Sequence, residues 1–450
     1  MRIDEETKAL QAKWTPLVEA MDAVGAVTTH GLSKGAILAR VLENTETTAR
    51  ANPVPLNLVE TSAPSSNGVG SSIATWSPVL IKMVKRLMPN LVSTDFMGTQ
   101  PLSTPDGLIF AMRARYNGQG NSSSYPEAFY QQIQSGFSGN SVADAGDVSG
   151  FTKAFLDTAL GSSASHVDPA FGQGVTASVA QTFGTTSQAW AQMGVTIEKN
   201  TVTAMSRGLY ADYTHELRQD MMAVHGEDVD AILSDMLVTE IQAEMNREFI
   251  RTMNVAAKIG AQNATVPGKF DLVADSDGRW LVERLKGMMF QLELDANAIA
   301  LDTRRGKGNR VLCSPNVASA LAMAGLLDYN LSNLNGNKDL QVDPTGQTFA
   351  GVLANGMRVY IDPYAILDYI TIGFKGASEM DAGIYYCPYT PLECYRTLGE
   401  TSFQPRLGFK SRYGIVANPF YAQDALGNAT SGLTQSSNGY FRKMLVTNIL

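Results

Sequence analysis

The sequence predicts an α+β protein from two kinds of apolar pattern. Residues 227–251 carry apolar side chains at intervals of three and four, which is typical of an amphipathic helix of about seven turns. Three other stretches alternate apolar with polar residues, which is typical of strands: 108–116, 193–205 and 406–416. A chain of 450 residues has room for roughly three domains built on such elements.

The composition indicates a folded, soluble chain. Hydrophobic residues make up 44% of the sequence, and no apolar run reaches the roughly 18 residues that a membrane span needs. Residues 1–6 are acidic and lack an apolar stretch, so the N-terminus does not resemble a secretory signal. The odd number of cysteines, three, favours a reducing compartment and folding without disulfides.

The charges argue against a broad nucleic-acid-binding surface. The net charge is −8, whereas phosphate contacts need clustered Lys and Arg, so the chain can lie near DNA without binding it. One basic cluster occurs, at Arg304, Arg305, Lys307 and Arg310. Three interpretations stay open for it: a grip on a phosphate backbone, ion pairs with a neighbouring chain, or a solvated turn, which is favoured.

The helix expected at 227–251 is interpreted as a structural beam. Glu227 and Asp228 lie at its start and Arg251 at its end, which suits the helix dipole. No catalytic group lies on its apolar stripe. Its polar face predicts a half-buried helix and carries Asp235, Glu240, Glu244, Arg247, Glu248 and Arg251.

Residues 1–60 form a separate unit in the sequence pattern. A helical seam runs through Leu10, Trp14, Leu17, Met21 and Val24 but is interrupted by Pro16. A second helix is expected at 34–43, followed by a Thr-, Asn- and Pro-rich linker at 44–57. An ordinary helical hairpin and a detachable, partner-binding segment are equally compatible with these residues.

The next segments lead into an insertion between two strands. Residues 61–75 are Ser- and Gly-rich, as in a flexible arm, and Ser77-Pro78 opens a helix that extends to Leu91. Residues 117–192 contain no Arg and abundant Gly, Ser, Ala and Gln, which predicts an irregular, exposed insertion before the return strand. Gly172-Gln173-Gly174 is a weak dinucleotide-site match that no strand precedes.

Short motifs of metal and catalytic chemistry are incomplete. The segment His215–Gln219 begins like a zinc-protease motif but has Gln where the second His is needed. Asp275–Gly278 resembles half of a calcium loop, yet Val273 and Arg284 stand at ligand positions and cannot ligate. We therefore expect no metal, no cofactor and no enzyme, and a hydrolase built on His215 and Glu216 is disfavoured.

The last third of the chain predicts short helices and strands. A helix at 279–294 is expected to bury Trp280, Leu281, Leu285, Met288 and Leu292. Further expectations are strands at 298–301 and 311–313, a helix at 314–327, a loop at 330–347, a hairpin at 352–360 with an Asn355-Gly356 type I′ turn, strands at 369–374 and 384–389, and a loose C-terminal tail.

Several blocks of sequence resemble the major capsid protein of T-even-type contractile-tailed phages. They lie at 77–92, 98–102, 107–116, 213–220, 223–226, 239–241, 244–248 and 408–414. The resemblance covers most of residues 58–420. It implies the Hong Kong 97-type capsid fold, with the beam as the spine helix of the peripheral domain.

The resemblance also implies a domain order. The expected parts are a cleaved, helical, scaffold-interacting propeptide (1–60), an N-terminal arm (61–76), a peripheral-domain helix with the first strand of an extended loop (77–116), an insertion in that loop (117–192), the return strand and spine helix (193–275), an axial domain (276–395), and a peripheral strand with the C-terminal tail (396–450).

Capsid proteins of the resembled group lose their propeptide to a phage protease that cuts after Glu in Leu/Ile-x-Glu. Leu58-Val59-Glu60 fits this motif, so cleavage is expected before Thr61. The same tripeptide recurs at 281–283, but there it lies in a predicted helix, whereas the first copy lies in a Pro-rich linker that a protease can reach.

The function implied is a self-assembling subunit of an icosahedral or prolate phage head that encloses double-stranded DNA without specific binding. Its expected partners are its own copies in hexameric capsomers, with scaffold, maturation protease, portal, vertex and decoration proteins, and no membrane. The expected location is the virion, after assembly in the host bacterial cytoplasm; the alternative is the shell of a cellular encapsulating compartment. Contacts between subunits are expected at Glu240, Glu244, Arg247, Arg251, Arg304, Arg305, Lys307 and Arg310.

Overall fold

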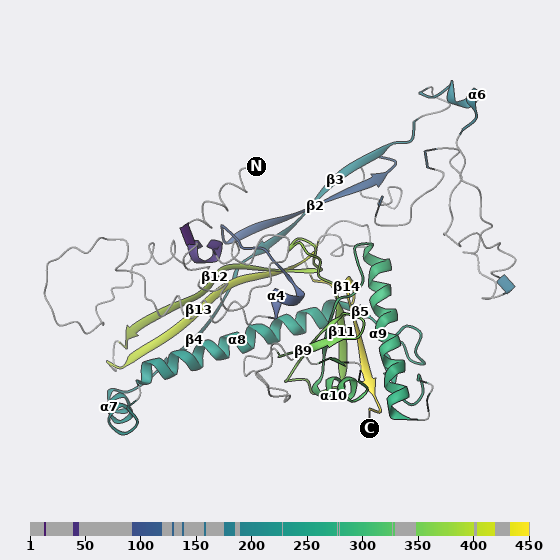
Figure 1. Ribbon diagram of the computed structural model, residues 1–450. Coiled ribbons are helices and arrows are strands. Elements are labelled where there is room, and N and C mark those ends of the chain that lie inside the picture. The colour runs from purple at the N-terminus through teal and green to yellow at the C-terminus, as the bar shows by residue number, and fades with distance from the viewer. Residues whose placement is uncertain are drawn as a thin grey trace. The chain divides into compact units, whose positions relative to one another are not determined.

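The computed structural model in Figure 1 divides the chain into two compact units. Unit 1 comprises Met1–Ile109, Asn200–Ala422 and Ser431–Leu450, and unit 2 comprises Phe110–Lys199 and Gln423–Thr430. The structure describes residues 13–14, 39–44, 92–118, 128–129, 137–138, 157–158, 175–184, 190–226, 228–276, 278, 280–325, 327–328, 348–399, 403–418 and 433–449. The expected arm at 61–76, the helix at 77–91, the loop at 330–347 and most of the insertion lie outside these ranges.

The predicted beam is helix α8, Val229–Ala256, which continues past the expected end at Arg251. Asp228 caps its start by accepting a hydrogen bond from the Asp230 N–H at 3.3 Å. Its apolar stripe is buried in the main core, with Met245 and Phe249 fully inaccessible to solvent. The prediction of a half-buried structural helix is confirmed.

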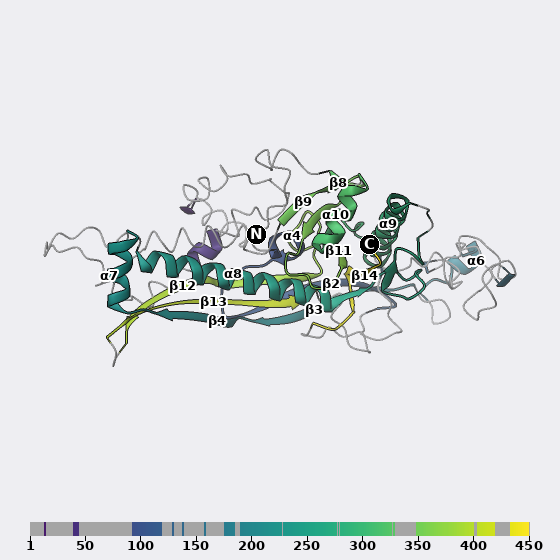
Figure 2. The same ribbon diagram turned by 90° about the horizontal axis from the view of Figure 1, so that it is seen from below.

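One sheet of unit 1 packs along α8, as Figure 2 shows. Its strand order is β1 (Gly98–Thr99), β12 (Ile384–Leu398), β13 (Pro405–Ala417) and β4 (Met205–Asp212). Phe249 of α8 makes edge-on contacts with Tyr386 of β12 and Tyr413 of β13, so aromatic rings join helix and sheet. The strands expected at 384–389 and 406–416 are confirmed, and β4 is an addition.

A second, eight-stranded sheet lies at the C-terminal end of α8 (Figure 1). Its order is β5 (Ala257–Ile259), β14 (Asn438–Thr447), β11 (Tyr369–Gly373), β7 (Arg310–Cys313), β10 (Arg358–Ile361), β9 (Thr348–Leu353) and β8 (Leu327–Asp328), with β6 (Lys269–Asp271) also paired to β14. Helices α9 (Leu281–Thr303) and α10 (Pro315–Met323) pack with these strands.

Helix α9 corrects two expectations. The strand expected at 298–301 is helical instead, because Ala296 and Ile299 continue the buried spacing begun by Leu292. Trp280 and Leu281 are not buried; they are 72% and 40% exposed and lie before the buried stripe, which starts at Leu285. Leu285, Met288 and Leu292 are buried as predicted.

The hairpin of β9 and β10 is confirmed, but its turn is not type I′. The Gly356 N–H donates to Leu353 O at 2.8 Å, and Gly356 takes a φ of 86°. Leu353 N–H also donates to Met357 O at 2.8 Å, so the loop consists of residues 354–356 and only its last residue, Gly356, is left-handed. Asn355 is used elsewhere, since its side-chain amide donates to Glu293.

Two further expectations fail near the ends of elements. Helix α10 ends at Met323 instead of 327, because Leu327 and Asp328 pair with β9 as strand β8. The C-terminal tail is not loose, because β14 pairs with β11 and buries Tyr440, Phe441, Met444 and Val446.

Strands β2 (Asp106–Tyr116) and β3 (Met193–Thr203) form a separate two-stranded ribbon, as predicted for the strands that flank the insertion. The chain passes along this ribbon from unit 1 into unit 2. Three shorter helices have the bounds α4 (Ser93–Phe96), α6 (Ala177–Ala180) and α7 (His215–Val224), and residues 39–44 are helical as well.

Candidate assembly surfaces

The charged face of α8 is partly engaged within the chain. Arg247 donates to the Asp362 carboxylate at 2.7 Å, and Glu244 pairs with Arg207 of β4 at 3.3 Å. Glu240 and Arg251 are exposed, and no ion pair of either is seen within the described ranges. Two of the four candidate contact residues, Glu244 and Arg247, are thus engaged inside the chain. The other two, Glu240 and Arg251, are exposed and have no ion pair within the described ranges.

Asp362 collects several hydrogen bonds at the start of the loop that follows β10. Its carboxylate is fully buried and accepts from Arg247 Nη1 and, at 2.6 Å, from the Tyr369 hydroxyl, while the Tyr364 N–H donates to its other oxygen at 3.0 Å. Burial and the neighbouring carboxylate raise the pKa of Tyr369, which keeps that hydroxyl a donor. This cluster fastens α8 to the eight-stranded sheet.

The basic loop between α9 and β7 is not an open cationic patch. Arg305 donates to Asp381 at 3.1 Å, and Lys307 pairs with Glu293. Arg310 begins β7, where desolvation lowers the pKa of its guanidinium. Arg304 is exposed and ends α9 with a left-handed φ of 53°. Arg304 and Arg305 are both exposed, which fits a solvated turn, whereas Lys307 and Arg310 are partly covered.

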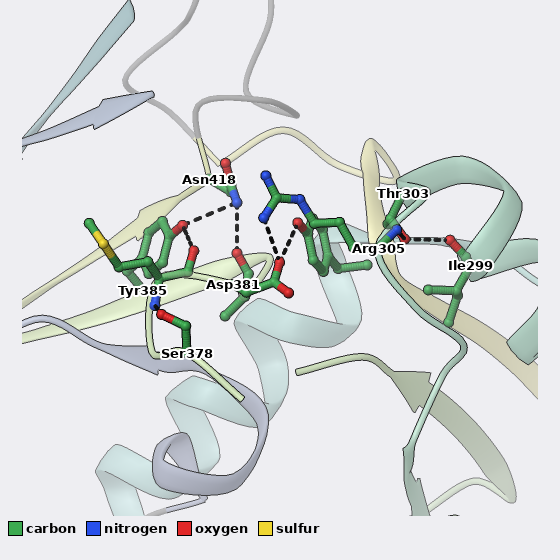
Figure 3. A network of polar contacts seen from close by, with 10 residues as sticks. Ile299, Thr303, Arg305, Ser378, Asp381, Tyr385 and Asn418 are labelled. Atoms are coloured by element: carbon green, nitrogen blue, oxygen red, sulfur yellow. Dashed lines mark hydrogen bonds and ion pairs between the residues drawn. The ribbon is translucent and has the colours of Figure 1, made fainter. Parts of the chain in front are cut away.

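Figure 3 shows how the Arg305–Asp381 pair belongs to a wider polar network. Asp381 also accepts from the Tyr440 hydroxyl of β14 at 3.1 Å. The Asn418 amide donates to Ala382 O at 2.8 Å and contacts the Tyr385 hydroxyl at 3.1 Å. These bonds hold the loop before β12 against both sheets, so Arg305 acts inside one chain.

The β2–β3 ribbon carries large apolar side chains on one face within unit 2. Arg115 Nε donates to Thr196 Oγ1 at 3.1 Å, which places both residues on the same face of the ribbon. Because successive side chains alternate between faces, the opposite face carries Phe110, Met112, Met193, Val195 and Ile197. These five residues, here called the apolar ribbon face, are 50–67% exposed. Exposed apolar clusters of this kind mark interaction sites.

A second apolar surface was not foreseen from the sequence. The loop between β10 and β11 exposes Tyr364, Ile366 and Leu367, and Ile366 is 95% exposed. The apolar residues of this loop can be read from the sequence. They follow neither helix nor strand periodicity, so a periodicity analysis does not identify them as a surface.

The predicted cleavage residues Leu58, Val59, Glu60 and Thr61 lie outside the described residues. The second copy of the tripeptide, at 281–283, lies in the first turn of α9, as expected. Described parts of residues 1–60 are packed on unit 1: Trp14, Ala39, Val41 and Leu42 are buried.

The residues of the two incomplete metal motifs make hydrogen bonds within the chain. His215 begins α7 and its Nε2 lies 3.2 Å from Phe403 O, while Asp275 accepts bonds from Thr265 and the Asp271 N–H, which lower its pKa. In the part of the chain that the structure describes, no group of three His, Cys, Asp or Glu is arranged to hold a metal.

The three cysteines, Cys313, Cys387 and Cys394, are free thiols. Burial raises the pKa of Cys313 and Cys387 to about 12. No helix among the described residues is both long and apolar enough to cross a membrane.

Sequence comparisons with known proteins agree on one family. Residues 73–446 match the family described as Major capsid protein Gp23. The chain is 51% identical to the Major capsid protein of Salmonella phage ViI, with 98% of each chain covered. It is 33% identical to the Major capsid protein of Enterobacteria phage T4, with 99% of each covered. A solved structure, "The capsid of Myoviridae Phage XM1", matches 78% of this chain and 89% of its own at 9% identity, with a TM-score of 0.39. From the family match and the two relatives, the chain belongs to the Gp23 family of phage major capsid proteins.

Proposed function

We propose that this capsid protein builds an icosahedral or prolate phage head, chiefly from hexameric capsomers. Membership of the major capsid family supports a place in the shell of the virion, and the resemblance of the sequence implies the Hong Kong 97-type fold. The observation that best supports assembly through broad surfaces is the apolar ribbon face, because its residues lack burial within the described chain. A shell subunit needs complementary surfaces of large area rather than a reactive pocket.

Electron microscopy of purified particles tests this proposal. We expect closed shells made mainly of this chain, or sheets and tubes when the recombinant precursor is expressed alone. A protein that stays a small, discrete monomer under all assembly conditions would contradict the proposal.

The shell is proposed to enclose double-stranded DNA without binding a sequence. The net charge of −8 and the internal pairing of Arg305 and Lys307 leave little concentrated positive charge for phosphates in the described residues. The alternative, a shell of a cellular encapsulating compartment, predicts particles without a phage genome. Nuclease-protected DNA of one genome length inside purified particles decides between these two contents.

Maturation is proposed to remove residues 1–60 by cleavage after Glu60. The support is the Leu58-Val59-Glu60 tripeptide in a Pro-rich linker, and its duplicate at 281–283 is held in a helix. Intact-mass spectra of mature virions should show a chain that begins at Thr61, and Glu60→Gln should leave the chain uncut. Glu283→Gln is the matched control and should be processed normally. Met1 retained in mature particles would rule the proposal out.

Partners are proposed from the same role. A precursor that is cut during assembly needs a protease, and we propose a scaffold beside it in the host bacterial cytoplasm and portal, vertex and decoration proteins in the finished head. The curated relatives are named as capsid proteins, which supports a structural rather than an enzymatic role. Mass spectrometry of isolated proheads should detect such components beside this chain.

A further inference from the structure

The N-terminal part of the chain has a defined docking site on unit 1. Residues 39–44 are helical, and Ala39, Val41 and Leu42 are almost completely buried in the main core cluster. Glu43 joins this segment to residues 13–14, because it pairs with Lys13 at 2.7 Å and accepts from Trp14 Nε1 at 3.1 Å. The predicted propeptide is therefore attached to the folded body by packing as well as by the chain.

Asn44 supplies polar contacts at the edge of this dock. Its side-chain Nδ2 donates to Leu102 O at 2.7 Å and to Tyr389 O at 3.0 Å. These two carbonyls belong to segments that run side by side: Gln100 N–H donates to Tyr386 O at 2.8 Å, and Leu102 N–H donates to Pro388 O at 2.9 Å.

The position of Asn44 is where this pairing ends. Leu102 N–H makes the last of these bonds; beyond it β12 shifts its register against β13 after Pro388, and the chain continues from Leu102 to β2. Two backbone carbonyls, those of Leu102 and Tyr389, thus lie within reach of one side-chain amide. A neutral amide with two N–H donors suits this place, whereas a carboxylate would repel both carbonyls.

We propose that residues 39–44 are a docking segment that clamps residues 98–102 against β12, with Asn44 as its polar anchor. Cutting after Glu60 breaks no contact of Asn44, so the released piece stays bound until the dock itself opens. The clamp is independent of processing, while the delayed release rests on the proposed cleavage. The surface that the piece vacates comprises the carbonyls of Leu102 and Tyr389.

Hydrogen exchange of the uncut full-length chain tests the clamp. In Asn44→Ala, the amides of Gln100 and Leu102 should exchange roughly tenfold faster, because two hydrogen bonds that order the neighbouring backbone are lost. Arg40→Ala changes the same segment but keeps both Asn44 bonds, so it should leave these amides as in the wild type. Equal exchange in the wild type and Asn44→Ala, with unchanged circular dichroism, would overturn the clamp. If Asn44→Ala does not fold, Asn44→Leu keeps a side chain of similar size and removes the donors without adding charge, and must show the same acceleration.

Retention of the N-terminal piece tests the release. A sequence-specific protease site replacing residues 58–61 in the full-length chain allows cutting at will. The wild-type piece should co-elute with the body on size exclusion, and the Asn44→Ala piece should dissociate roughly ten times faster. Immediate separation in both proteins would overturn retention. A different natural cleavage site in virions would contradict the processing proposal alone, since the exchange experiment involves no cleavage.

Discussion

The α8 helix and the β2–β3 ribbon present opposite kinds of side chain to their surroundings. Glu244, Glu248 and Arg247 of the helix pair with β4, β13 and Asp362, so these charged residues serve the subunit itself. The ribbon instead leaves Phe110 and Ile197 57% and 67% exposed. Within unit 2 the residues of the apolar ribbon face stay half or more exposed.

This contrast changes where contacts between subunits should be sought. Charged residues on a helix find partners within reach of their long side chains, so charge alone is a poor sign of an interface. Large exposed apolar side chains stay a cost until another surface covers them. We therefore rank the apolar ribbon face and the loop with Ile366 above Arg247, Arg305 and Lys307 as contact surfaces. Glu240 and Arg251 stay predictions.

The largest expected effect is on assembly. Placing charge on the apolar ribbon face with Phe110→Asp and Ile197→Asp should abolish particles and leave the subunit folded, because burying an unpaired carboxylate in a contact costs more than about 2 kcal/mol. Sedimentation and electron microscopy measure the particles, and circular dichroism measures the fold. Ser178→Asp, an exposed position in α6, is the control and should assemble normally. Normal shells from the double variant would show that the apolar ribbon face is not a contact surface between subunits.

The next effect is on the stability of the unassembled subunit. Asp362→Ala should lower the free energy of unfolding by about 3 kcal/mol, because Arg247 and the Tyr369 hydroxyl both lose a buried acceptor. Urea titration of the full-length chain measures this change. Glu240→Ala on the exposed face of α8 is the control, expected within about 0.5 kcal/mol of the wild type. Equal stabilities would show that α8 is not fastened through Asp362.

A smaller, pH-dependent effect is expected in the basic loop. A hydrogen bond from Lys307, helped by Asn355, holds the pKa of Glu293 below its ordinary value. A lowered folded-state pKa gives stability that is present above the ordinary Glu pKa of about 4.3 and is lost as the pH falls through the folded value. Because this pair is partly exposed, Glu293→Gln should cost less than about 1 kcal/mol at neutral pH.

Urea titrations of both proteins between neutral and acidic pH check this sign. The difference between wild type and Glu293→Gln should shrink as the pH falls. A difference that grows on acidification would contradict the internal pairing of Lys307.

The smallest effect on the isolated subunit is expected at Arg251. Arg251→Glu should change the free energy of unfolding by less than about 0.5 kcal/mol, because its side chain is exposed. If Arg251 meets a neighbouring copy, the variant should assemble more slowly at low salt, and added salt should reduce the defect. Light scattering during assembly measures the rate. Identical rates at every salt concentration would remove Arg251 from the candidate contacts.

The sequence by itself determined the elements whose signal is local. The three-and-four spacing of α8, the alternation of β2, β3 and β13, and the Pro-opened α10 all depend on residues a few positions apart. Blocks such as 213–220 also gave the family resemblance, which the family match confirms. The domain boundaries and the cleavage residues stay predictions.

Only the tertiary structure decided which side chains are satisfied within the chain. Arg247 meets Asp362 across 115 residues, and Asn44 meets Tyr389 across 345, so no local pattern contains either pair. The C-terminal strand β14 appeared as a loose tail because its partner β11 lies far away in sequence. Periodicity reports which face of an element is apolar, whereas packing of distant segments decides whether that face is covered, and the apolar ribbon face is the case left open for a second copy.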